Sequence, residues 1–124
     1  MARILVIEDN PANFKLAAMV LNMAGHNAIW AQDAPAGFDQ MRKDPPDLIL
    51  LDIQLPGMDG VDAAKKIKAD PLTRAIPLIA LTARAMKGDE DVYREAGFDA
   101  FLPKPYSHSQ LTDLVSLLLP SRMR

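Results

Sequence analysis

Five short apolar runs alternate with five segments that carry helix signals, and this alternation restricts the fold more than any other feature of the chain. The apolar runs predict strands at residues 3–7, 28–31, 48–53, 78–82 and 100–102. Because a β-α-β-α order places helices on both faces of a parallel sheet, the sequence predicts the α/β class. The chain has 124 residues, enough for one domain with its own core.

Residues that favour helix ends flank the segments between the predicted strands. Asn10, which precedes a proline, predicts the start of the first helix, because asparagine caps free N–H groups and proline suits the first helical position. Asp33 and Asp89 are placed to cap the second and fourth helices. The third helix is expected at about residues 61–69, and residues 107–110 match a capping box for the fifth.

Composition and charge exclude several classes of function. The chain has no cysteine, which excludes disulfides and thiolate metal sites. A net charge of −2 gives no electrostatic footprint for nucleic acid. No apolar run reaches the length of a membrane span, and the one near Met1 is too short for a signal peptide. We therefore expect a cytoplasmic protein without nucleic-acid or membrane partners, with one domain at 1–120 and a short tail at 121–124.

Asp52 follows an apolar run at 48–51 that predicts a strand buried on both faces. A Pro-Gly-Met-Asp-Gly stretch at 56–60 then turns the chain. In an open α/β sheet, ligands bind outside the carboxyl ends of the strands, so a carboxylate at this point is a candidate functional group. Taken alone, this segment fits a helix cap or an ordinary loop carboxylate equally well.

Glu8 and Asp9 follow the first predicted strand, and a parallel sheet brings them to the same edge as Asp52. Two unit charges about 4 Å apart at an effective dielectric of about 20 cost roughly 4 kcal/mol, which a divalent cation relieves. Oxygen ligands without histidine or cysteine favour Mg²⁺, and too few ligands are present for a structural Ca²⁺ site. For Glu8 and Asp9 alone, compensation of a helix dipole is the alternative.

Two further polar residues are expected at this edge. Thr82 ends the fourth predicted strand and Lys104 follows the fifth. A metal, an ammonium group and a hydroxyl around one carboxylate are what an acyl-phosphate site requires, because the cations balance the charge on the transferring oxygens. Each residue alone also fits an ordinary strand threonine or a surface lysine.

Short motifs surround these strand ends in a fixed order: Ile7-Glu8-Asp9, Leu50-Leu51-Asp52-Ile53, Leu55-Pro56-Gly57-Met58-Asp59-Gly60, Ala80-Leu81-Thr82-Ala83, Glu95-Ala96-Gly97 and Lys104-Pro105. Through them the whole chain resembles the CheY-like receiver domain of two-component response regulators. Within that family it is most similar to the stand-alone DivK type of cell-cycle regulator. The resemblance implies a flavodoxin-like, doubly wound (βα)₅ fold with a five-stranded parallel sheet of order 2-1-3-4-5.

The resemblance also implies a role for each site residue. Asp52 would be the phosphoacceptor, and Lys104 would contact the phosphoryl group. Asp9, Asp52 and the backbone carbonyl of Gln54 would bind Mg²⁺, for which Mn²⁺ can substitute, while Glu8 would assist through water. The glutamate at position 8 replaces the commoner aspartate of the family, which can change metal affinity.

Switching and partner recognition are likewise implied by the family. Thr82 would move toward the phosphoryl group after transfer. Phe101 would be the aromatic residue that changes position on switching, and it would act by packing because it lacks a phenolic oxygen. The peptide bond before Pro105 is cis in the family. The expected protein is a phosphoacceptor, not an enzyme, and its partners are a histidine kinase or histidine phosphotransfer protein and downstream protein targets. A monomer is expected, with phosphorylation-dependent dimerisation as the alternative.

The first predicted helix carries an apolar second face that suits a partner. In the family this helix docks on the kinase, which implies docking residues Ala12, Asn13, Leu16 and Met19. The alternative is a broad buried face. We expect His26 to lie on the solvated surface and Trp30 to pack in the core or at a strand edge.

Four other functions share parts of this pattern. An aspartyl-phosphate phosphatase uses a strand-end aspartate, but its D-x-D motif is absent at Asp52. A flavodoxin-like electron carrier needs a phosphate-binding loop where Glu8 and Asp9 would repel phosphate. A non-phosphorylated interaction module and a receiver excised from a hybrid kinase remain open.

Overall fold

A computed structural model of the chain describes residues 2–55, 57–83 and 89–120, so the tail expected at 121–124 lies outside the described residues. The strands are β1 (Arg3–Ile7), β2 (Asn27–Ala31), β3 (Leu48–Asp52), β4 (Leu78–Thr82) and β5 (Ala100–Pro103). The helices are α1 (Pro11–Met23), α2 (Ala34–Lys43), α3 (Gly60–Ala69), α4 (Asp89–Ala96) and α5 (His108–Leu118).

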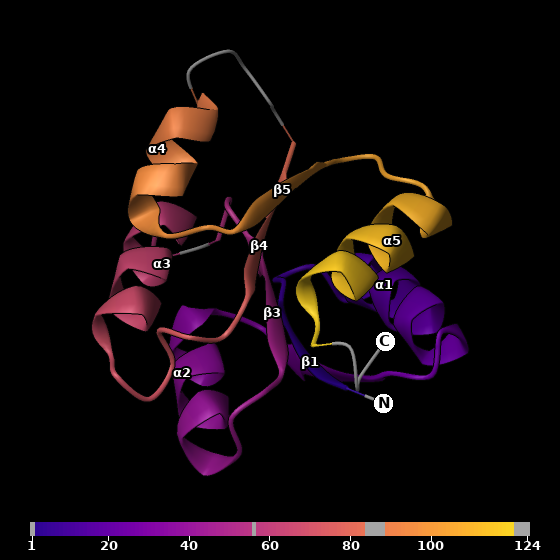
Figure 1. Cartoon of the computed structure of the whole chain (residues 1–124), viewed down its shortest axis with the longest axis horizontal. Helices are drawn as coiled ribbons and strands as arrows, with labels where there is room; N and C mark the ends of the chain where they lie inside the picture. The colour runs from indigo at the N-terminus through magenta and orange to yellow at the C-terminus, as the bar shows by residue number, and fades with distance from the viewer. Residues whose placement is uncertain (1, 56, 84–88, 121–124) are drawn as a thin grey trace.

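The five strands form one parallel sheet in the order β2-β1-β3-β4-β5. Helices α2, α3 and α4 cover one face of the sheet, and α1 and α5 cover the other (Figure 1). This is the flavodoxin-like, doubly wound (βα)₅ fold, so the predicted fold class and strand order are confirmed. No helix within the described ranges is both long enough and apolar enough to cross a bilayer.

The helix caps explain why the helices begin where they do. The side chains of Asn10 and Asp33 each accept a backbone N–H of the following helix at 2.9 Å, and Ser107 and Gln110 form the two reciprocal bonds of a capping box. Each bond satisfies a donor that a helix start leaves unpaired. Asp89 is the first residue of α4, one position inside the helix that it was expected to cap.

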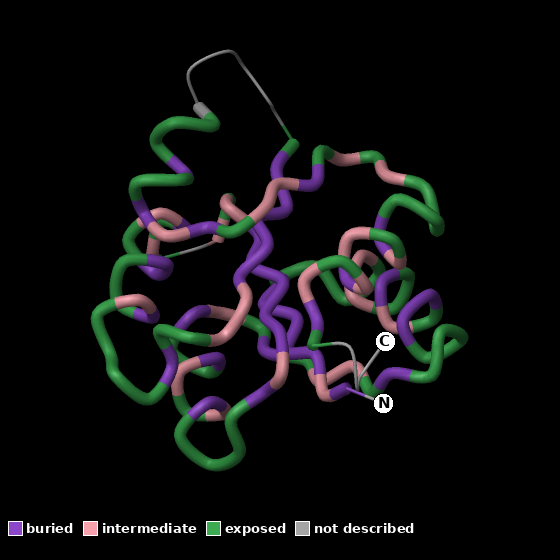
Figure 2. The backbone as a smooth tube through the Cα atoms, viewed as in Figure 1, coloured by how far each residue is buried: buried purple, intermediate pink, exposed green. Residues whose placement is uncertain are grey.

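The sheet is buried on both faces, which leaves its carboxyl edge as the place where polar side chains emerge. Every side chain of β3 from Leu48 to Leu51 has an exposed fraction of 0%, and buried residues run through the centre of the molecule in Figure 2. One cluster packs the sheet against α2, α3 and α4, and a second packs it against α1 and α5. The predicted central strand is therefore confirmed.

Gly60 fixes how closely α3 approaches the end of β3. A Cβ atom at this position would lie 2.6 Å from Ile53 Cα and 3.1 Å from the carbonyl oxygen of Asp52. Only glycine lets the helix begin this close to rigid backbone. The Asp59 side chain caps the same helix start, accepting the Val61 N–H at 2.8 Å. The start of α3 is thus held against the end of β3.

Helix α1 has one buried and one exposed apolar face. Ala17, Val20 and Leu21 are buried, whereas Leu16 and Met19 are 58% and 52% exposed. The exposed apolar face predicted from the sequence is therefore present, and the alternative of a broad buried face is excluded for these two residues.

His26 lies in the interior, so the prediction of a solvated surface histidine was wrong. The Ala2 N–H donates to His26 Nδ1 at 3.2 Å, at the amino end of the sheet. This bond requires an unprotonated Nδ1, and burial lowers the pKa of His26 below its usual value. The sequence shows neither the hydrogen bond nor the burial, because both depend on how the β1 and β2 ends pack.

The lowered pKa of His26 predicts an acid-sensitive component of stability. The unfolded chain protonates this imidazole first as the pH falls, so stability is complete above the unfolded pKa of about 6.5 and declines below it. We expect urea midpoints to fall less between about pH 7.5 and about pH 5.5 in His26→Asn than in the wild type. His108→Asn, at an exposed position, is the control and should match the wild type. Equal slopes in all three proteins would contradict the assignment.

Candidate functional site

Three carboxylates meet at the carboxyl edge of the sheet. Glu8 and Asp9 follow β1 and Asp52 ends β3, and one oxygen of each lies within 4.8 Å of the others. Glu8 and Asp52 are 2% and 5% exposed, whereas Asp9 is open to solvent. The parallel sheet therefore brings together the three acidic residues selected from the sequence.

Lys104 joins the two buried carboxylates from the end of β5. Its Nζ lies 2.8 Å from Asp52 Oδ2 and 3.2 Å from Glu8 Oε2. Its backbone N–H donates to the carbonyl oxygen of Thr82 at 2.7 Å, which ties the segment after β5 to the end of β4. The Lys104–Pro105 peptide bond is cis. The Lys104 ammonium group is thus in direct contact with the carboxylate of Asp52, the candidate phosphoacceptor.

Backbone and side-chain donors orient the remaining carboxylate oxygens. The Gln54 N–H donates to Asp52 Oδ1 at 3.0 Å. Glu8 Oε1 accepts from the Asn10 N–H at 3.2 Å and from Asn13 Nδ2 at 3.3 Å. The sequence had marked Asn10 only as a helix cap and Asn13 only as a docking residue. Their position one turn apart at the start of α1, beside Glu8, was the signal that could have identified this second role.

The electrostatics of the site favour added positive charge. Burial raises the pKa of Glu8 above its usual range, and the neighbouring Asp52 carboxylate raises it further, while Lys104 opposes both. Burial works to lower the pKa of Lys104, but Asp52 and Glu8 together outweigh it and the pKa is raised. One ammonium group therefore compensates the three carboxylates only in part.

The donor set fits a hard divalent cation. Within the described part of the chain, the cluster offers three carboxylate oxygens and no histidine or cysteine ligand, as Mg²⁺ and Mn²⁺ prefer. Gln54, whose backbone carbonyl was predicted as a ligand, lies at the same edge and is held there by its N–H bond to Asp52. Glu8, Asp9 and Asp52 are the side chains that would hold the ion.

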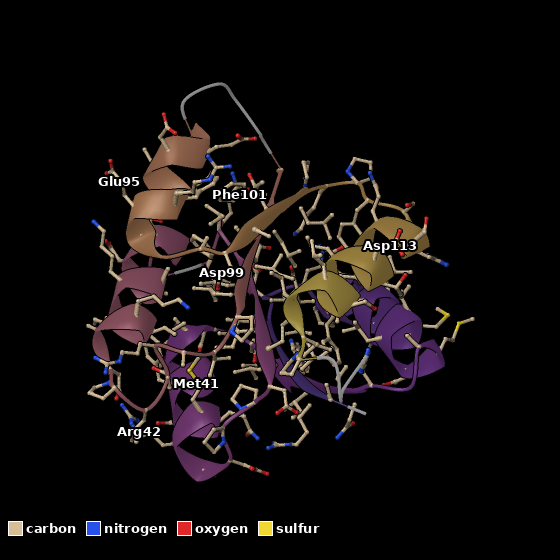
Figure 3. The ribbon with its side chains drawn as sticks, viewed as in Figure 1. Met41, Arg42, Glu95, Asp99, Phe101 and Asp113 are labelled. Atoms are coloured by element: carbon tan, nitrogen blue, oxygen red, sulfur yellow. The ribbon has the colours of Figure 1, made fainter. Side chains whose placement is uncertain are left out.

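Thr82 and Phe101 lie on the face of the sheet that α4 covers. Thr82 is 3% exposed at the end of β4, and Phe101 pairs in register with Ala80, two residues earlier on that strand. The Phe101 ring lies 5.6 Å from the Tyr93 ring, and the Arg94 guanidinium lies 5.6 Å from the Phe101 centroid. Figure 3 shows Phe101 between β5 and α4. Phe101 thus connects β5 to α4, on the same face of the sheet as Thr82.

The fold and the site together define a receiver domain, and comparison with known proteins gives the same result. The chain belongs to the response regulator receiver domain family, whose model matches residues 4–116. It is 38% identical to the polar-differentiation response regulator DivK of Brucella anthropi over 116 residues, 94% of either chain. The phosphoacceptor role is general to this family, and the resemblance to the family and to DivK regulators is confirmed.

Two similar solved structures contain a metal ion. The receiver domain of the sensor histidine kinase PA1611 from Pseudomonas aeruginosa PAO1 has magnesium coordinated in its active-site cleft. It is 32% identical, with a TM-score of 0.86 over 94% of this chain and 96% of that one. The Mn²⁺-bound form of response regulator Rcp1 is 27% identical, with a TM-score of 0.84 over 97% and 99% of the two chains.

Removal of the Lys104 charge should destabilise the metal-free protein, most strongly at high pH. Lys104→Met leaves two buried carboxylates without their cation, and we expect a loss of about 1.5–3 kcal/mol, typical for hydrogen bonds to charged groups. The Glu8 pKa should rise further. Because the folded state then binds protons more readily than the unfolded state, part of the loss should return as the pH falls.

Urea unfolding at about pH 8 and about pH 5.5 measures both effects. Lys104→Arg keeps a cation at this position and should retain most of the stability. A Lys104→Met deficit that is equal at the two pH values would contradict this account of the site.

Proposed function

We propose that this chain is a single-domain response regulator whose Asp52 accepts a phosphoryl group from a histidine kinase or a histidine phosphotransfer protein. The observation that carries the proposal is the 2.8 Å contact between Lys104 Nζ and a buried Asp52 carboxylate, beside Glu8 and Asp9. The phosphorylated protein signals through protein–protein interaction. It acts as a phosphoacceptor and not as an enzyme on other substrates, and it assists its own phosphorylation and dephosphorylation.

The transfer step needs a nucleophile, charge compensation and a fixed geometry. A carboxylate oxygen of Asp52 attacks phosphorus, the P–N bond breaks, and the imidazole of the donor keeps its electron pair. The Gln54 N–H and the Lys104 ammonium hold the two Asp52 oxygens in different directions, which fixes the carboxylate plane. Attack of water on phosphorus later returns Asp52 and inorganic phosphate.

Mg²⁺, or Mn²⁺ in its place, would be held by Asp9, Asp52 and the backbone carbonyl of Gln54, with Glu8 assisting through water. When bound, the ion supplies charge stabilisation for the phosphoryl oxygens. Glu8 is held in place by Asn13 and Lys104, so it is suited to an indirect role behind the exposed Asp9.

Phosphorylation at Asp52 is transmitted through Thr82 and Phe101. The Thr82 hydroxyl moves toward the new dianion, and the space it leaves lets Phe101 shift inward from its packing against Tyr93. Because Phe101 contacts α4, this shift remodels the surface formed by α4, β5 and α5. About 5.5 kcal/mol of differential stabilisation would drive such an equilibrium from 1:99 to 99:1.

The phosphodonor docks on the start of α1. Ala12, Asn13, Leu16 and Met19 provide this surface; Leu16 and Met19 are more than half exposed, and Asn13 touches Glu8 at the site. Leu16 and Asn13 also line a cavity of about 350 Å³ that reaches Glu8 and Lys104. An apolar partner surface seated here would bring its phosphohistidine to the carboxyl edge of the sheet.

The likeness to DivK regulators supports a role in cell-cycle or developmental control. The proposed protein is cytoplasmic and monomeric, with dimerisation on phosphorylation as the alternative, and residues 1–120 form its receiver domain. Its partners are proteins, without nucleic-acid or membrane binding.

Phosphorylation at Asp52 can be tested directly with a small donor. Purified protein incubated with Mg²⁺ and acetyl phosphate should gain the mass of one phosphoryl group, and Asp52→Asn should gain none, because its amide is not a competent nucleophile. Chelation of the metal should abolish the gain. Intact-mass spectrometry under mild conditions gives the readout.

If acetyl phosphate does not phosphorylate the protein, the next donor to test is a phosphorylated histidine phosphotransfer protein. Transfer from it to the wild type, but not to Asp52→Asn, would uphold the proposal. If neither donor phosphorylates the protein, the phosphoacceptor assignment is wrong and the chain acts as a non-phosphorylated interaction module.

Docking on α1 predicts a variant that discriminates between donors. Leu16→Ala combined with Met19→Ala should reduce kcat/KM for the protein donor by about tenfold, the loss expected for two apolar interface side chains. Phosphorylation by acetyl phosphate should be unchanged, since both residues lie outside the carboxylate cluster. Leu72→Ala is the matched control, because it truncates a leucine that is 79% exposed in the segment between α3 and β4, outside the proposed docking surface. Equal loss with both donors would contradict docking here.

A further inference from the structure

Trp30 connects the edge strand of the sheet to the backbone of the carboxylate cluster. It lies on β2, and its indole Nε1–H donates to the carbonyl oxygen of Glu8 at 2.8 Å. The side chain is 40% exposed, so burial alone does not account for its position. The hydrogen bond is shorter than the usual N–H···O distance of about 2.9–3.0 Å, which indicates a well-formed contact.

The bond fixes the peptide between Glu8 and Asp9. The Glu8 N–H already donates to the Ala31 carbonyl at 3.0 Å, so with Trp30 both polar groups of the Glu8 backbone are held by β2 and its end. A peptide unit is planar, and fixing its carbonyl also fixes the direction of the Asp9 N–H. The point from which the Asp9 side chain departs is therefore set by Trp30.

Asp9 depends on its backbone more than the other two carboxylates do. Glu8 and Asp52 are each held by side-chain hydrogen bonds, including those from Lys104. Within the described ranges, no hydrogen bond or ion pair anchors the Asp9 carboxylate, which is exposed. A ligand without side-chain support keeps its position only through the backbone that carries it.

Phe14 holds the indole in this orientation. Its ring stacks on Trp30 with centroids 5.4 Å apart and an interplanar angle of 16°. Phe14 is next to Asn13 on α1, and the Asn13 amide donates to the Glu8 carboxylate. The stack thus ties β2 and the start of α1 to the same acidic residue, one through its backbone and the other through its side chain.

We infer that Trp30 is a positioning residue for the metal site: its indole N–H, held by Phe14, orients the Glu8–Asp9 peptide so that the Asp9 carboxylate is set for a divalent cation. The inference rests on the proposed function, because it concerns the same metal site. It assigns a task to an edge-strand tryptophan that supplies no ligand atom.

The decisive experiment removes the N–H and keeps the rings. Trp30→Phe keeps a ring for the Phe14 stack. The chain contains one tryptophan, so biosynthetic replacement by benzothienylalanine, a near-isostere with sulfur in place of N–H, changes no other residue. We expect both proteins to bind Mg²⁺ about two- to tenfold more weakly than the wild type in calorimetric titration, as for the loss of one neutral hydrogen bond.

A structural control separates positioning from general destabilisation. Thr73→Val removes a side-chain bond to the Ile67 carbonyl, 2.6 Å long, remote from the carboxylate cluster. It should lower the urea midpoint but leave the Mg²⁺ dissociation constant unchanged. Benzothienylalanine also removes one hydrogen bond to a backbone carbonyl but preserves the stack, so it should lower the urea midpoint no more than Thr73→Val does and should still weaken Mg²⁺ binding.

The outcomes distinguish this inference from the proposed function. If the wild type binds no Mg²⁺ at millimolar concentration, the metal site itself is wrong, and the inference fails with it. If the wild type binds Mg²⁺ and both Trp30 replacements bind it equally well, the inference alone is overturned. An affinity loss that Thr73→Val reproduces would also overturn it, because weaker binding would then follow from lower stability.

Discussion

The repulsion between Glu8, Asp9 and Asp52 is the constraint to which the rest of this structure responds. Two of the three carboxylates are buried, and water cannot screen them as it does at a surface. The fold holds them at one edge because β1 and β3, two paired parallel strands packed on both faces, leave no freedom for their ends to separate. Lys104 compensates part of this negative charge. A divalent cation would compensate more of it, and a phosphoryl group on Asp52 would change the charge of the site. A site that is incompletely compensated at rest is suited to respond when its charge changes.

Much of this site followed from the sequence, because strand ends in a parallel sheet have a predictable common edge. Glu8, Asp52 and Lys104 each stand at the end of an apolar run, and the β-α alternation alone was enough to bring them together. Caps such as that at Asn10 were equally predictable, since they depend on residues only a few positions apart. Both kinds of inference need only local pattern and topology.

The remainder depends on tertiary packing that no local pattern contains. His26 looked like a surface residue because a histidine between a glycine and an asparagine carries no mark of burial, yet it accepts a hydrogen bond from the Ala2 backbone. The bond joins Trp30 on β2 to Glu8, 22 positions away and just after the neighbouring β1, and the pairing of these two strands fixes which groups can meet. Sequence reasoning placed Trp30 in the core or at a strand edge and named no partner for its indole; it lies on the edge strand β2 and is 40% exposed.

In the proposed function, one face of the sheet serves partner docking and the other serves the conformational switch. The carboxylate cluster lies at the carboxyl edge, between these two faces. On one face, Asn13 of α1 donates to Glu8, so a partner docked on this helix as proposed would contact a residue that is hydrogen-bonded to the cluster. On the other, Phe101 of β5 packs against Tyr93 of α4, and Thr82 ends β4, the strand that pairs with β5. The sheet itself is too tightly packed to deform smoothly, so under the proposed function a change of charge at Asp52 would be relieved by discrete rearrangement of half-buried groups at its edge. Phe101 is such a group, whereas the fully buried strand residues beneath it are not. That contrast is a physical reason for a phosphorylation signal to travel along the carboxyl edge toward α4 and not through the core.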